Sequence, residues 1–211
     1  GLRQGKWAEI GAPLPKGHAI DIPKTIFRRI EQKEIDSLRA KFAGRGDAED
    51  AEPEFSDLDL EVGEVVSAVR HPDAERLFVE RVRLSDGDRQ IVSGLAEHYQ
   101  PEELVGKKVM ILRNLKPASL RGVESQGMLL IAEGKVDGAT KVEVIQCEKS
   151  HVGDKVLRKG EKSEPKPMVT FDQFKKVKIE VNDHSIFCDG KPLATKSEEL
   201  KAKHVKEGLV G

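Results

Sequence analysis

Several features that would assign a function directly are scarce or missing in this sequence. It has 211 residues, but only 4% are aromatic, two are cysteine, and 36 Lys and Arg balance 37 Asp and Glu. A core must therefore depend on Val, Leu and Ile, and overall charge indicates no nucleic-acid partner. No apolar run approaches the roughly 18 residues that span a membrane, and the first residues lack the layout of a secretory signal. We expect a protein of a reducing, cytoplasmic compartment with no membrane contact.

Patterns typical of catalysis and metal binding are also missing. Cys147 and Cys188 lie far apart without metal-ligand spacing, so we expect both to fill small apolar spaces. Asp183-His184-Ser185 has the residue types of a catalytic triad, but three consecutive side chains cannot form a relay. In HPDAERL, we expect Asp73 to form a turn or cap a helix, and this interpretation is favoured over a catalytic role for His71. We predict no catalytic site, no metal and no cofactor.

The N-terminal part divides into two regions. Residues 1–43 carry apolar residues spaced by three and four, which predicts an amphipathic helix over 25–43 that follows Pro23 and ends at Gly44. Residues 44–56 form a predicted flexible linker, because eight acidic residues and no basic one occur from Asp47 to Glu61. The Arg-Gly-Asp tripeptide at 45–47 lies in this linker and is interpreted as spacer.

Residues 57–160 change to the alternating pattern of β-strands. Strands are predicted at 58–69, with a bulge or bend at Gly63, and at 78–84, 90–95, 107–112 and 126–132. SDGD (85–88) is typical of a hairpin turn, and PEEL (101–104) of a short helix. Five strands with a helix between the third and fourth predict an OB-fold, a partly open Greek-key barrel.

Residues 161–211 contain a further series of strands. They are predicted at 177–181, 185–188 and 191–195, with turns at Asn182-Asp183 and Asp189-Gly190. So small a meander cannot hold a core alone, so we expect it to dock on the barrel. The predicted fold class is thus mainly β, a five-stranded OB-fold with a C-terminal β-rich extension, preceded by a helical segment and an acidic linker.

Positive charge collects around the connection between the fourth and fifth predicted strands. No acid occurs between residues 107 and 121, where the cations are Lys107, Lys108, Arg113, Lys116 and Arg121. In an OB-fold this connection borders the oligonucleotide-binding face, and neutral donors alternate with the cations. A solvated, lysine-bearing surface is the alternative interpretation. Because Phe78 and Tyr99 are the only rings near the barrel, the pattern favours a folded RNA held by its backbone over a stacked single strand.

Three segments carry a family resemblance: LDLEVGEVVSAVRHPDAERLFVERVRL, IVSGL and NLKPASLRGVESQGMLLIA. They resemble the tRNA-binding domain shared by endothelial monocyte-activating polypeptide II (EMAP II), the yeast cofactor of glutamyl- and methionyl-tRNA synthetases, and small bacterial tRNA-binding proteins. The match runs from about Leu58 through Gly160. Residues 153–157 and 171–211 resemble the extra C-terminal domain of the eukaryotic members, which covers the dimerisation surface of bacterial relatives and so implies a monomer.

The N-terminal stretch LPKGHAIDIPKTIFRRIEQKEIDSLRAKFAG resembles the end of a methionyl-tRNA synthetase, just after its anticodon-binding helices. The chain is therefore expected to be the C-terminal end of a eukaryotic methionine–tRNA ligase with an appended module. Because the HIGH and KMSKS signatures are absent, this chain should not aminoacylate tRNA by itself. The module is expected to raise the synthetase's affinity for tRNA, at the outer corner of the L and without strong preference among tRNAs.

The family's tRNA-contacting motif falls on Asn114, Lys116, Arg121, Ser125 and Met128, although MLLI is also typical of a buried strand that would place Met128 in the core. With the other cations, the predicted tRNA-binding residues are Lys107, Lys108, Arg113, Asn114, Lys116, Arg121, Ser125 and Met128. The alternative function is a protein-interaction or cytokine-like module, with the helix at 25–43 docking another synthetase or a scaffold protein. Cytokine-active relatives carry a basic heptapeptide on the first strand. Residues 61–67 here read EVGEVVS, which argues against secreted signalling.

Overall fold

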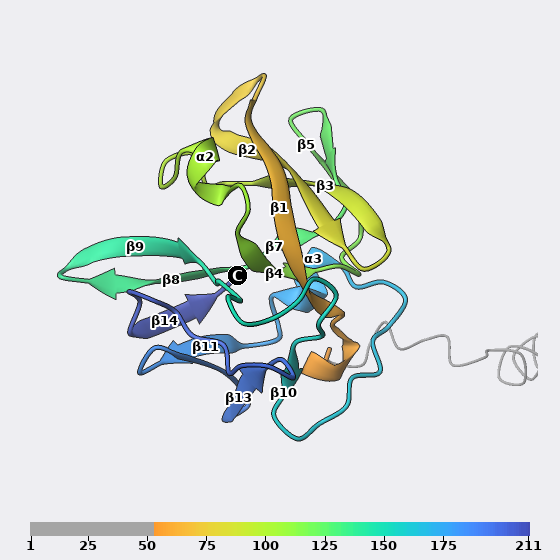
Figure 1. Ribbon diagram of the computed structural model, residues 1–211, viewed down its shortest axis with the longest axis vertical. Coiled ribbons are helices and arrows are strands. Elements are labelled where there is room, and N and C mark those ends of the chain that lie inside the picture. Colours follow the sequence, from red (N-terminus) through yellow and green to blue (C-terminus); the bar gives the residue numbers. More distant parts are fainter. Residues whose placement is uncertain (1–52) are drawn as a thin grey trace, which may run out of the picture. The chain divides into compact units, whose positions relative to one another are not determined.

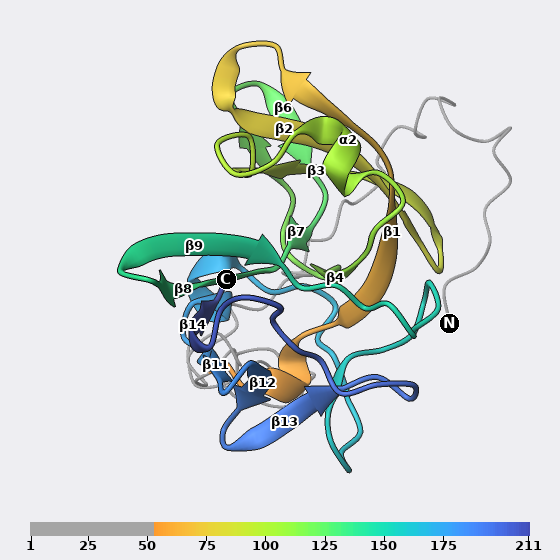
Figure 2. The same ribbon diagram turned by 60° about the vertical axis from the view of Figure 1, so that its left-hand side comes forward.

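A computed structural model describes residues 53–211 (Figure 1). The helix predicted at 25–43 and the Arg-Gly-Asp tripeptide lie outside these residues. Within them the fold is mainly β, as predicted. Two larger sheets lie one above the other in Figure 1, and a two-stranded hairpin projects beside the upper one. Strand β1 runs from the upper sheet down to the lower part of the molecule, as Figure 2 also shows.

The upper sheet curls into the half-barrel expected for an OB-fold. Its order is β3-β2-β1-β4-β7, with all neighbours antiparallel. Its strands are β1 (Leu60–His71), β2 (Ala74–Leu84), β3 (Gly87–Ser93), β4 (Lys108–Leu112) and β7 (Met128–Leu129). Helix α2 (Pro101–Leu104) lies between β3 and β4 in the chain, at the predicted place. The fifth predicted strand is divided between β7 and the start of β8.

Gly63 has a different role from the one predicted. It stays in register with β4, opposite Val109, and the two irregularities of β1 come later, between Val65 and Ser67 and between Arg70 and His71. A Cβ atom on Gly63 would lie 2.6 Å from Cγ1 of Val82 and 2.8 Å from Cδ2 of Leu84. The glycine is therefore needed because β2 side chains pack against the backbone of β1, and not because the strand bulges there.

The lower sheet joins the C-terminal extension to the barrel. Its order is β10-β13-β12-β11-β14-β8-β9. Its strands are β8 (Ile131–Val136), β9 (Ala139–Val144), β10 (Leu157–Arg158), β11 (Ile179–Asn182), β12 (Ser185–Cys188), β13 (Lys191–Ala194) and β14 (Glu207–Val210). The prediction of a meander docked on the barrel is confirmed. Its first turn is Asp183-His184, one residue later than predicted, because Asn182 pairs with Ser185.

Two apolar cores share the central strands. One lies inside the barrel, and the other lies between the barrel and the C-terminal extension. Alternate residues of β4 enter different cores: Val109 and Ile111 face the barrel interior, whereas Met110 and Leu112 face the extension. Cys147 and Cys188 are fully buried in the second core, as expected of apolar fillers.

The end of the acidic stretch, which was predicted to be a flexible linker through residue 56, is folded in the structure. Residues Phe55–Asp57 form a short 3-10 helix, η2, and Phe55 is buried in the second core. Farther on, Asp59 and Glu61 are buried as well. Apolar anchors and ion pairs therefore order this part of the stretch despite its like charges.

Candidate nucleic-acid interface

The connection between β4 and β7 forms a hairpin that the sequence pattern did not predict. Strands β5 (Ala118–Leu120) and β6 (Val123–Ser125) pair with Ser119 opposite Glu124 and Leu120 opposite Val123. Arg121 and Gly122 make the turn, with φ of 51° and 88°. Two successive residues with positive φ are typical of the tight turn that matches the twist of a hairpin. Arg121 is therefore presented at an exposed tip.

The base of this hairpin is fixed by Asn114. Its side-chain oxygen accepts a hydrogen bond from the backbone N–H of Asp59 at 2.9 Å, and its amide donates to the carbonyl oxygens of Asp57 and Lys166, each at 2.9 Å. Val169 and the hairpin base also exchange backbone hydrogen bonds, from Val169 to Asn114 and from Lys116 to Val169. The C-terminal extension thus holds the start of the hairpin in place.

The other end of the hairpin is fixed by Ser125, which is buried. Its hydroxyl accepts from the backbone N–H of Val92 at 3.0 Å and donates to the carbonyl of Gly127 at 2.9 Å. A Cβ atom on Gly127 would lie 3.0 Å from the carbonyl oxygen of Leu112, so the chain passes close to β4 here. Ser125 therefore connects β6 to β3.

The hairpin also contacts the turn between β1 and β2. His71 is buried, and its Nδ1 accepts from the backbone N–H of Asp73 at 3.0 Å. The proton of a neutral ring is then on Nε2, which donates to the carbonyl of Leu120 at 3.1 Å. Asp73 lies in this turn, as predicted. The two loops that border the binding face of an OB-fold are thus joined directly.

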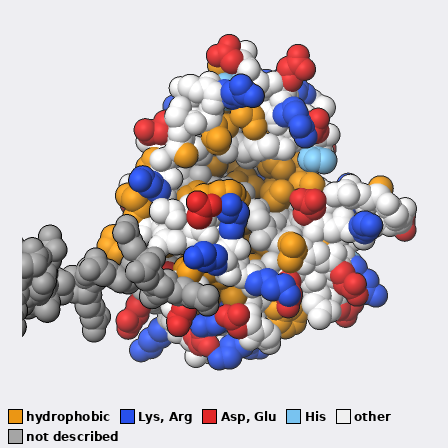
Figure 3. All heavy atoms as spheres, turned by 180° about the vertical axis from the view of Figure 1, so that it is seen from behind, with side chains coloured by type: hydrophobic (Ala, Val, Ile, Leu, Met, Phe, Trp, Pro, Cys, Tyr) orange, Lys and Arg blue, Asp and Glu red, His pale blue; other side chains and the backbone are white. Residues whose placement is uncertain are grey.

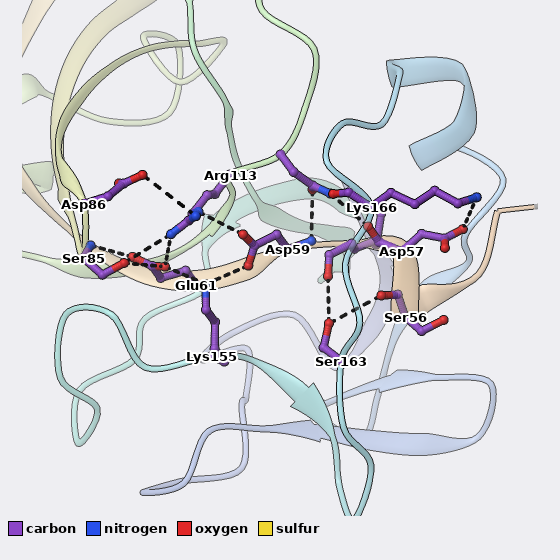
Figure 4. Close-up of polar contacts among 12 residues, drawn as sticks. Ser56, Asp57, Asp59, Glu61, Ser85, Asp86, Arg113, Lys155, Ser163 and Lys166 are labelled. Atoms are coloured by element: carbon purple, nitrogen blue, oxygen red, sulfur yellow. Dashed lines mark hydrogen bonds and ion pairs between the residues drawn. The ribbon is translucent and has the colours of Figure 1, made fainter. Parts of the chain in front are cut away.

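Arg113 belongs to a partly buried network of ion pairs around the buried carboxylates of Asp59 and Glu61 (Figure 4). Its Nε lies 2.9 Å from Oδ2 of Asp59, and its Nη1 lies 3.1 Å from Oε2 of Glu61. Lys155 contacts the same two carboxylates at 2.7 and 2.8 Å, and Ser85 donates to Glu61 through its backbone and hydroxyl. Burial by itself raises the pKa of Glu61, but the hydrogen bonds from Lys155 and Ser85 outweigh it and hold that pKa below its usual value.

Lys108 is the first residue of β4 and Lys107 directly precedes it, so both lie away from the hairpin that follows the end of β4. The ammonium of Lys108 donates to the carbonyl of Glu148 at 2.7 Å and to that of Ser150. The ammonium of Lys107 lies 5.2 Å from the centre of the Tyr99 ring. Both cations therefore have partners within the protein, and the structure does not bring them together with Lys116 or Arg121.

Lys116 and Arg121 are exposed, and neither makes an ion pair with any residue from 53 to 211. Lys116 lines a mainly apolar hollow of about 440 Å³, to which the half-buried Met128 also contributes. Arg121 lines a second hollow, and both hollows reach Gly94. The structure thus brings these two cations to adjoining sites.

Arg81 was not among the predicted residues. It is exposed on β2, without an ion pair in the described part of the chain, and it lines a third hollow with Gln90 and Gln126. This is the face of strands 2 and 3 that OB-folds use for oligonucleotides. Charged residues alternate regularly along β2, so the sequence did not distinguish Arg81 from its neighbours. Its outward position, opposite Gln90 on β3, identifies it in the structure.

Among the residues that the structure describes, no group of His, Cys, Asp and Glu could hold a metal ion. None of the helices in residues 53–211 is long and apolar enough to cross a bilayer.

Comparisons with known proteins agree with this architecture. Residues 60–155 match the family described as "Putative tRNA binding domain". The methionine–tRNA ligase of Flavobacterium johnsoniae is 42% identical over 139 residues, which are 58% of this chain and 20% of that protein. The methionine–tRNA ligase of Borrelia turicatae is 30% identical over 209 residues, which are 92% of this chain and 28% of that protein.

The methionine–tRNA ligase of Thermococcus kodakarensis is 55% identical over 80 residues, covering 38% of this chain and 11% of that protein. The chain thus spans between 11% and 28% of the length of these curated relatives. Among solved structures, the C-terminal domain of Plasmodium vivax p43 aligns with a TM-score of 0.67 at 24% identity, over 74% of this chain and 98% of that one, which supports the fold. The chain is therefore similar to part of several methionine–tRNA ligases, and its residues 60–155 match the family described as "Putative tRNA binding domain".

Proposed function

We propose that this chain is the tRNA-binding module of a methionyl-tRNA synthetase and raises the affinity of that enzyme for tRNA without taking part in catalysis. The observation that carries the proposal is the pair of cations, Lys116 and Arg121, at adjoining hollows on a hairpin whose two ends are fixed. Cations that make no ion pair within residues 53–211 are available to neutralise phosphates, and a fixed backbone limits the entropy lost on binding.

The predicted binding residues then divide by role. Lys116, Arg121 and the newly identified Arg81 contact phosphates, and Met128 borders the surface where a sugar or base packs. Arg113, Asn114 and Ser125 hold the hairpin in position, because their polar atoms already bond to the protein. Lys107 and Lys108 add positive potential at a distance.

The bound RNA is the outer corner of tRNA, gripped through its backbone. Phe78 is fully buried and the Tyr99 hydroxyl accepts from the backbone N–H of Val144, so neither ring is free to stack along a single strand. Tethering the module to a synthetase makes the second contact intramolecular, which raises avidity by a factor of about 100 or more. We further propose that the chain acts as a cytoplasmic monomer.

The proposal is tested by filter binding of a tRNA transcript across a range of salt. If about four phosphates are engaged, the slope of log K against log salt is roughly -3 to -4. Lys116→Glu with Arg121→Glu should make the slope shallower by about two and weaken binding by about tenfold for each lost contact near 0.1 M salt.

A matched control is Lys141→Glu with Lys203→Glu, which changes the net charge equally at two exposed lysines of the lower part of the molecule. It should leave the slope unchanged. A flat salt response, or an equal loss in both double variants, would reject a specific phosphate-binding surface at the hairpin.

A further inference from the structure

An apolar hollow opens between the β5–β6 hairpin and α3 (Phe171–Phe174), directly beside Lys116. Seen from the side of the molecule that carries α3, hydrophobic side chains gather in a hollow between the upper and lower parts, with charged side chains around it (Figure 3). The residues that form its apolar walls include Val92, Leu115, Leu120, Met128, Ile131 and Phe171. Phe171 is 51% exposed and Leu120 is 39% exposed, so large apolar surfaces face solvent here.

Phe171 supplies an exposed aromatic ring, which neither Phe78 nor Tyr99 of the barrel provides. It comes from the C-terminal extension and is placed by a capped helical turn, in which Thr170 Oγ1 accepts from the backbone N–H of Gln173 at 3.2 Å. The ring lies 6.5 Å from that of Phe174, which is buried in the second core. The ammonium of Lys175 lies 5.0 Å from the ring centre of Phe171. An open aromatic surface therefore lies among cations.

We infer that this hollow takes one unstacked nucleobase of the bound RNA, packed against Phe171, while Lys116 and Arg121 hold the neighbouring phosphates. The inference rests on the proposed function and adds a base contact to it. The volume of about 440 Å³ is at the low end of the range of about 300 to 1,000 Å³ for small-molecule sites, which suits a single nucleoside.

RNA fits this combination better than an apolar peptide. A nucleotide offers a flat face for the ring and a phosphate for each cation, whereas an apolar peptide would leave both cations without partners. Folded RNAs present such bases in bulges and loops, where aromatic side chains stack on them without reading sequence strongly. The site therefore selects RNA with an extruded base, and not a particular tRNA.

The test uses the whole chain and two RNA duplexes of about 12 base pairs, one regular and one with a single bulged 2-aminopurine. The wild type should bind the bulged duplex about fivefold or more tightly than the regular one, and the fluorescence of 2-aminopurine should change on binding. Phe171→Ala should lose this preference and the fluorescence change, but keep its affinity for the regular duplex. Phe171→Tyr should retain both.

Leu209→Ala is the control, since Leu209 is 58% exposed on β14 and does not line the hollow. Equal affinity of the wild type for the two duplexes, together with salt-dependent tRNA binding, would overturn the base site and leave the proposed function standing. Loss of salt-dependent tRNA binding itself would overturn both. Displacement of the bulged probe by an apolar peptide, but not by regular duplex, would identify a protein-docking site instead and overturn the inference.

Discussion

Glu80 makes the stability of this protein depend on pH in a predictable direction. It lies on β2, is 1% exposed, and pairs with residues of β1 and β3 inside the sheet. Its Oε1 accepts a hydrogen bond from the hydroxyl of Ser93, but Oε2 has no partner among residues 53–211. Burial raises the pKa of Glu80 from 4.5 to about 8, and the bond from Ser93 offsets only part of this effect.

The direction in which the free energy of unfolding changes with pH follows from proton linkage. Between the unfolded pKa of about 4.5 and the folded value of about 8, the folded protein keeps a proton that the unfolded chain releases. The free energy of unfolding therefore falls as pH rises through this interval, and the contribution is fully present below it. Since one pKa unit corresponds to about 1.4 kcal/mol, the loss is on the order of 3 to 5 kcal/mol.

Glu80→Gln should remove this dependence because an amide does not titrate. Near pH 5 the variant should be equal to the wild type or about 1 kcal/mol less stable, since its amide NH₂ lacks an acceptor. Near pH 9 it should be more stable by a few kcal/mol. Urea unfolding followed by circular dichroism, at several pH values from about 5 to 9, measures both curves.

Glu75→Gln is the control, because Glu75 is exposed on the same strand. It should follow the pH dependence of the wild type. If wild type and Glu80→Gln lose stability in parallel between about pH 5 and pH 9, the buried carboxyl is not the cause and the reasoning fails.

Two further predictions concern the residues that hold the hairpin. Arg113→Ala leaves Glu61, which is fully buried, with one cation instead of two; urea unfolding should show a loss of roughly 3 to 5 kcal/mol, and a loss below about 1 kcal/mol would contradict a structural role for the pair. Asn114→Ala leaves the Asp59 N–H and the Asp57 carbonyl without this partner, so the free energy of unfolding should fall by roughly 2 to 4 kcal/mol. Hydrogen exchange of the backbone amides in residues 115–127 should also become faster. Its tRNA salt slope should match the wild type, whereas a slope shallower by about one would mean that Asn114 itself contacts phosphate.

Alternating apolar residues were sufficient to predict most of the fold. The strands of the barrel and of the extension repeat with a period of two, and each period places one row of side chains in a core. The pattern could not show why Gly63 is a glycine, because the atoms that exclude a side chain there belong to β2. The β8–β9 hairpin was missed although its Asp137-Gly138 turn, with φ of 51° and 83°, is a strong local signal.

The candidate site was only partly predictable, for a related reason. A run of cations between Lys107 and Arg121 shows where charge gathers, but not which cations already have partners. Arg113 and Lys108 bond to residues more than 20 positions away in the chain, so only the folded structure separates them from Lys116. Phe171 reaches the site from the far end of the sequence, and no local pattern connects it to the hairpin.

The alternation of β4 residues between the two cores has a mechanical consequence. Both faces of β4 are buried, one in each core. The barrel and the extension therefore cannot separate without exposing Met110 and Leu112 on one side or Val109 and Ile111 on the other. Residues 53–211 should accordingly melt in one cooperative step. Removing the extension would expose an apolar side of the barrel and would also release the base of the β5–β6 hairpin.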